Sequence, residues 1–126
     1  MTRNDRGAAA VEFALVVPLL VLLIFGVAEF GRAYYVQTTL SGAAREGVRV
    51  MALKNDASAA RSAAVSAAST LGVTSAQVSV SPSSCVSTAD SAVSATVTVT
   101  YPMEYVTGLF GPSITLTGKG VMRCNG

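Results

Sequence analysis

The side chains that could catalyse a reaction are few and scattered in this chain of 126 residues. Histidine is absent, and the acids Asp56, Asp90 and Glu104 stand singly in expected loops or at element ends. Nucleophilic and acid–base catalysis need a nucleophile, a base and an orienting group within hydrogen-bonding reach. The many Ser and Thr hydroxyls have no such base, and neither a phosphate-binding glycine loop nor a calcium-binding run of acids occurs. The sequence therefore predicts no enzyme, no cofactor and no metal site.

Glu12 is the one ionisable residue in an apolar run from Ala8 to Ala28. At about 1.5 Å per residue, a helix of this length spans the hydrocarbon core of a bilayer, roughly 30 Å. A carboxylate there costs about 2.5–3.5 kcal/mol at mid-helix and less near an end. Glu12 could reach the cytoplasmic interface, or it could await a cation inside the membrane. In a repeated assembly, the amino terminus of a neighbouring chain could supply that cation.

Cys85 and Cys124 are the two cysteines, and their spacing fits neither a zinc site nor a thioredoxin-like pair. A disulfide between them would persist only in an oxidising compartment. Closing a loop of about 40 residues could add about 4 kcal/mol to stability on the chain-entropy model. Two free thiols are the alternative, and in so small an exported domain we expect the disulfide.

Basic residues around the apolar run predict its orientation. Arg3 and Arg6 precede it, whereas Arg32 is the one basic residue close behind it. The positive-inside rule therefore favours a cytoplasmic N-terminus and an extracytoplasmic C-terminal domain. Gly26-Val27-Ala28 is a weak signal-peptidase site with Glu29 directly after it, so we expect a retained anchor. The net charge of +2 comes from scattered residues, which argues against nucleic acid as a partner.

The helix is expected to continue beyond the membrane, from Ala8 to Leu53, with Pro18 and Gly26 as points of bending. Apolar and small residues recur there at three- and four-residue steps, which predicts one buried face. This face comprises Val36, Leu40, Ala43, Ala44, Gly47 and Met51.

A second helix is expected after the turn at Lys54, with Asn55 or Asp56 as its N-cap, running to about Leu71 and stopping at Gly72. Its narrow stripe of small residues would permit close packing on the first helix. The stripe comprises Ala57, Ala60, Ala64, Ala68 and Leu71. An Ala/Ser linker without fixed structure is the alternative.

From Val78 onward the apolar period changes to two, which predicts a small antiparallel sheet with one face on the helix and a Ser/Thr face in water. The alternating positions are Val78, Val80, Val93, Ala95, Val97, Val99, Tyr101, Ile114 and Leu116. Within the loop between the last strands, Val106, Leu109 and Phe110 could form an exposed apolar patch, although burial under the sheet is the commoner outcome.

The segment from Arg6-Gly7 to Glu12-Phe13 resembles the prepilin-peptidase recognition site of the tight-adherence (Tad, or Flp) pilus system, in which a Gly and four further residues precede Glu and an aromatic residue. Ala43-Ala44-Arg45-Glu46-Gly47-Val48-Arg49 extends the resemblance to TadE-like minor pilins, or pseudopilins, over residues 7–53. The strands at 97–102 and 114–117 also resemble the C-terminal half of those proteins, whereas Met103-Glu104-Tyr105 is more polar than their pattern.

This resemblance implies cleavage after Gly7, so that Ala8 becomes the N-terminus and Glu12 pairs with the amine of an adjacent subunit. It implies as partners other pilin or pseudopilin subunits, the pilus assembly platform, the prepilin peptidase and the lipid bilayer.

We therefore expect an α+β protein with a leader peptide (1–7), a transmembrane segment (8–28) of a long helix, and an extracytoplasmic pilin-like domain (29–126) with a second helix and a small antiparallel sheet. The expected function is assembly of a Tad-type adhesive pilus as a single-pass protein of the cytoplasmic (inner) membrane, or of the surface pilus itself. A stand-alone membrane-anchored extracytoplasmic binding domain is the alternative.

Overall fold

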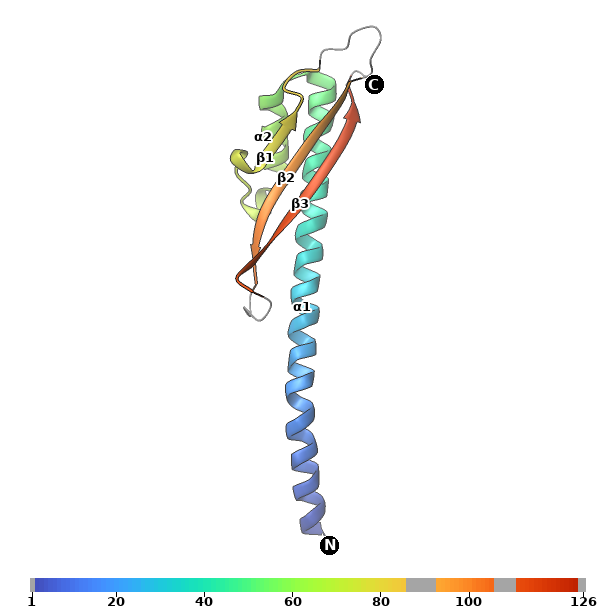
Figure 1. Ribbon diagram of the computed structural model, residues 1–126, viewed down its shortest axis with the longest axis vertical. Coiled ribbons are helices and arrows are strands. Elements are labelled where there is room, and N and C mark those ends of the chain that lie inside the picture. Colours follow the sequence, from blue (N-terminus) through green and yellow to red (C-terminus); the bar gives the residue numbers. More distant parts are fainter. Residues whose placement is uncertain (1, 86–92, 106–110, 125–126) are drawn as a thin grey trace. The chain divides into compact units, whose positions relative to one another are not determined.

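In the part of the chain that the structure describes, seven helices and strands form the α+β fold, which confirms the predicted class (Figure 1). The computed structural model describes residues 2–85, 93–105 and 111–124, so the predicted patch at 106–110 lies outside the described residues. In chain order the elements are α1 (Thr2–Lys54), α2 (Ala57–Ala67), the 3-10 turns η1 (Ser69–Leu71) and η2 (Ser75–Gln77), and the strands β1 (Val78–Ser81), β2 (Ser94–Glu104) and β3 (Ser113–Arg123). The chain divides into two compact units, residues 1–32 and 33–126, and α1 contributes to both.

The first unit is helical from Thr2, six residues earlier than the sequence predicts. The sequence between Thr2 and Gly7 contains no proline, so nothing in it breaks a helix. Gly7 weakens a helix by only about 1 kcal/mol, so the helix tolerates it. Pro18 lies inside α1, which continues without interruption to Lys54.

In the second unit, α1 buries the face that the three- and four-residue spacing predicts. Val36, Leu40, Ala43, Ala44, Val48 and Met51 are each at most 2% exposed. The alanine stripe covers part of this face, because Ala60 and Ala64 of α2 and Ala68 directly after it are fully buried. A Cβ placed on Gly47 would lie 3.1 Å from the Ala60 carbonyl oxygen and 3.2 Å from both the Ala64 and Val97 side chains, so α1, α2 and β2 meet at this glycine.

The turn between α1 and α2 uses both predicted residues, each for a different purpose. Asn55 adopts a left-handed conformation (φ 51°), which Asn tolerates better than most residues, and ends α1. Asp56 is the N-cap of α2, and its carboxylate accepts a hydrogen bond from the Ala59 N–H at 3.1 Å. The helix ends at Ala67, earlier than predicted, and passes into η1 before Gly72 closes the segment at φ 70°.

The sheet is antiparallel with the order β1-β2-β3, and it covers the helices of the second unit (Figure 1). Ala95, Val97 and Val99 of β2 are fully buried, whereas the intervening threonines are partly exposed, as the period of two predicts. On β3 the prediction is wrong for Ile114, which is 39% exposed. Gly118 and Gly120 of β3 are buried instead. Because glycine has no side chain, this strand approaches the backbone of α1 closely at both positions.

Candidate functional site

The predicted processing and assembly residues lie near the N-terminal end of α1, and all are exposed. Gly7, Ala8, Glu12 and Phe13 are helical, and Phe13 is 71% exposed. Ala8 and Glu12 are four residues apart, so they lie on one face of the helix, about 6 Å apart along its axis. No other part of the described chain covers this face, which leaves the Glu12 carboxylate open to a group from another molecule.

Gly7 has no packing role within the chain. A Cβ placed on it would have no atom within 4 Å, so an alanine would fit there and would also favour the helix. Gly26, Gly31 and Gly42 of α1 are equally open, so these surroundings do not distinguish Gly7 from other glycines of the helix.

The apolar run around Glu12 is uncovered on all sides. Within the described chain, α1 is the one helix that is long and apolar enough to cross a membrane. Its most apolar stretch has a mean hydropathy of 2.7, and none of that stretch is buried. Leu15, Leu19, Leu23 and Val27 are 62–69% exposed. A helix that is apolar all round needs an apolar environment, so this segment is consistent with membrane anchoring.

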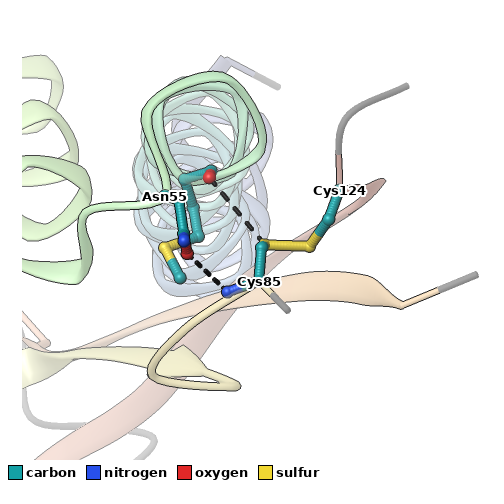
Figure 2. The surroundings of a disulfide bond; sticks show 4 residues. Asn55, Cys85 and Cys124 are labelled. Carbon is teal, nitrogen blue, oxygen red and sulfur yellow. Dashed lines mark hydrogen bonds between the residues drawn. A yellow bond between two sulfur atoms is a disulfide. The ribbon is translucent and has the colours of Figure 1, made fainter. Parts of the chain in front are cut away.

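The two cysteines form a disulfide that holds the end of β3 against the loop after β1 (Figure 2). The Cα atoms of Cys85 and Cys124 are 5.7 Å apart, within the usual range for a disulfide. Asn55 adds a second connection, because its side-chain oxygen accepts a hydrogen bond from the Cys85 backbone N–H. Cys124 also donates its own N–H to the Val93 carbonyl oxygen at 2.9 Å. The end of α1 and the ends of two strands are therefore joined at one point.

Replacing both Cys85 and Cys124 with Ser should lower the free energy of unfolding of the second unit by about 4 kcal/mol, because the unfolded chain regains the entropy of the open loop. Chemical denaturation of the full chain in detergent, followed by protease sensitivity of the second unit, measures this change. Dithiothreitol should weaken the unchanged protein by a similar amount and leave the double variant unaffected. Equal stability of both proteins without reductant would contradict the prediction.

Two residues important for the fold were missed by the sequence analysis. A Cβ placed on Gly118 would lie 2.3 Å from the Leu40 carbonyl carbon, and one on Gly120 would lie 2.8 Å from that of Ala44. Glycines at alternate positions of a strand are a signal of close backbone approach, and this signal was available. Within residues 2–85, 93–105 and 111–124, no three His, Cys, Asp or Glu residues are grouped so that they could bind a metal ion.

A family model described as TadE-like protein matches residues 7–49. The match begins at Gly7 and ends at Arg49, so it contains Glu12, the whole apolar run and most of the buried face of α1. No curated protein and no solved structure matches the chain. The resemblance inferred from the N-terminal residues is thereby confirmed over this range, whereas the match does not extend to the strands.

Proposed function

Because this chain is a TadE-like protein over residues 7–49, we propose that it is a membrane-anchored minor pilin or pseudopilin that takes part in assembly of a Tad-type adhesive pilus. The observation that carries the proposal is the exposed Glu12 within an uncovered apolar helix, five residues after Gly7 and within the matched range. The role is structural and not catalytic.

Processing would create the partner that Glu12 lacks. Hydrolysis of the Gly7–Ala8 bond by a prepilin peptidase consumes one water and leaves a carboxylate on Gly7 and an amine on Ala8. That amine is protonated near neutral pH, so the Ala8 ammonium of one subunit could pair with the Glu12 carboxylate of the next. In a low-dielectric membrane an opposite charge at close range offsets the cost of burying the carboxylate.

The proposed arrangement assigns residues 1–7 to a leader, 8–28 to the transmembrane segment and 29–126 to a domain outside the cytoplasm. Arg3 and Arg6 support a cytoplasmic N-terminus through the positive-inside rule. The disulfide between Cys85 and Cys124 supports the same orientation, because disulfides persist on the oxidising side of the membrane. Other pilin subunits and the assembly platform are the proposed partners.

The N-terminal sequence of the protein from membranes tests this proposal. We expect it to begin at Ala8 when the prepilin peptidase is present and at Met1 when the peptidase gene is deleted. Mass spectrometry of the intact protein measures both forms. Retention of residues 1–7 in the presence of an active peptidase would contradict the proposal and would favour the stand-alone anchored binding domain.

A further inference from the structure

Two adjacent tyrosines on α1 are exposed just where the helix enters the second unit. Tyr34 is 66% exposed and Tyr35 is 54% exposed, whereas the next residue, Val36, is only 2% exposed. They follow the predicted end of the transmembrane segment by six and seven residues. Large aromatic side chains on a surface need an explanation when they occur together, because burying them elsewhere would be favourable.

The directions of the two rings restrict what could cover them. Consecutive residues on an α-helix point about 100° apart, so Tyr34 and Tyr35 occupy different faces of α1. A single partner helix centred on one tyrosine would contact the other only at the edge of its face. A layer that surrounds the helix would cover both, and lipid headgroups around a membrane helix form such a layer. Tyrosine suits that layer because its ring is apolar and its hydroxyl is polar.

The next turn of α1 satisfies its own hydroxyl groups. Thr38 and Thr39 each donate their hydroxyl to the Tyr35 carbonyl oxygen, at 2.9 Å, so both hydroxyl hydrogens are satisfied within the helix. Such bonds to a preceding carbonyl are how threonine is accommodated in membrane helices. Residues 33–44 contain no charged side chain. This turn therefore presents neither a charge nor an unsatisfied hydroxyl hydrogen.

We propose that Tyr34 and Tyr35 lie in the lipid headgroup layer, at the point where α1 leaves the membrane. This proposal depends on the membrane anchoring proposed above, and it moves the segment inside the hydrocarbon about one helical turn toward the C-terminus. The shift moves Glu12 toward one headgroup layer and places Glu29 just inside the other, and near either end of the span a carboxylate costs less than at mid-bilayer. Arg32 falls at headgroup level, where a long basic side chain is readily accommodated.

The sequence contains no tryptophan, so single-tryptophan variants of the full chain report depth without background. We would compare Tyr34→Trp and Tyr35→Trp with two controls on the same helix, Leu23→Trp in the apolar run and Leu53→Trp near the end of α1. Leu23 and Leu53 are similarly exposed, at 62% and 66%. The proteins are placed in phosphatidylcholine–phosphatidylglycerol vesicles whose lipids carry bromine, a fluorescence quencher, either near the headgroup or near the chain end.

We expect the Tyr34→Trp and Tyr35→Trp variants to be quenched about twofold more by bromine near the headgroup than by bromine near the chain end. The Leu23→Trp variant should show the opposite order, and the Leu53→Trp variant should be quenched only by water-soluble acrylamide. If both tyrosine variants are quenched only by acrylamide, as expected for Leu53→Trp, while Leu23→Trp is quenched by brominated lipid, the headgroup proposal is wrong. The proposed membrane anchoring is then still supported. If Leu23→Trp is not quenched by either brominated lipid, the proposed membrane anchoring is wrong, and the headgroup position of the tyrosines is wrong with it.

Discussion

Replacing Gly118 with alanine is expected to destabilise the second unit by about 3 kcal/mol or more, a large part of the roughly 5–15 kcal/mol that stabilises a typical domain. The added Cβ would lie 2.3 Å from the carbonyl carbon and 2.4 Å from the oxygen of Leu40. Both are backbone atoms in the middle of α1, so they cannot move aside as a flexible side chain would. The strand β3 would have to leave the helix, together with the hydrogen bond that Gln37 donates to the Thr117 carbonyl oxygen at 2.7 Å.

Urea denaturation of the full chain in a mild detergent, read by pulse proteolysis of the second unit, measures this loss. Gly42→Ala is the matched control, because Gly42 is also in this unit and a Cβ there would have no atom within 4 Å. Since Gly42 lies inside α1, its replacement should raise stability by about 0.5–1 kcal/mol. A Gly118→Ala variant that unfolds at the urea concentration of the unchanged protein would show that β3 does not lie against α1 as described.

Replacing Glu12 with glutamine is expected to abolish or strongly reduce piliation while membrane insertion and removal of residues 1–7 continue. Glutamine retains the size and hydrogen-bonding capacity of glutamate but cannot pair with an ammonium group as an ion. Loss of a charge partner in a low-dielectric setting typically costs about 3–5 kcal/mol, a factor of about 150 or more in the association constant. Electron microscopy of the cells and immunoblots of sheared filaments measure assembly, and N-terminal sequencing measures processing.

Glu46→Gln provides the matched control for this experiment. Glu46 lies on the same helix, is exposed and undergoes the same chemical change, but it is outside the apolar run. We expect this variant to form pili normally. Normal piliation of the Glu12→Gln variant as well would remove the proposed role of the carboxylate, whereas loss of processing in that variant would assign Glu12 to peptidase recognition instead.

Much of the fold could be predicted because the buried faces have clear periods. The helical spacing of Leu40, Ala44 and Met51 and the alternation of Val97 and Val99 each specify one face, and the structure buries both. The glycine contacts of β3 were missed for a physical reason. Periodicity is read from side chains, and a strand that packs through Gly118 and Gly120 has none at those positions.

The boundaries were predicted less well, because local competition sets them. Ser69 and Thr70 follow α2 in the chain, and their hydroxyls compete with helical backbone bonds, which is consistent with the change to a 3-10 turn. At the candidate site, residue types and spacing were sufficient to select Gly7 and Glu12. Their proposed roles remain predictions, because they depend on a peptidase and on a second subunit, and the physics of one chain specifies neither.

The disulfide has a mechanical consequence for the proposed role in a pilus, where a subunit would carry tension. A pull between the membrane helix and Cys124 would pass through the Cys85–Cys124 bond and bypass the chain between them, a sequence separation of 39 residues. At about 3.3–3.6 Å per residue, the bypassed chain would be roughly 130 Å long if fully extended, and the disulfide prevents this extension. Under such a pull the chain could lengthen only through the residues before Cys85, so it would extend less before the load reached a covalent bond.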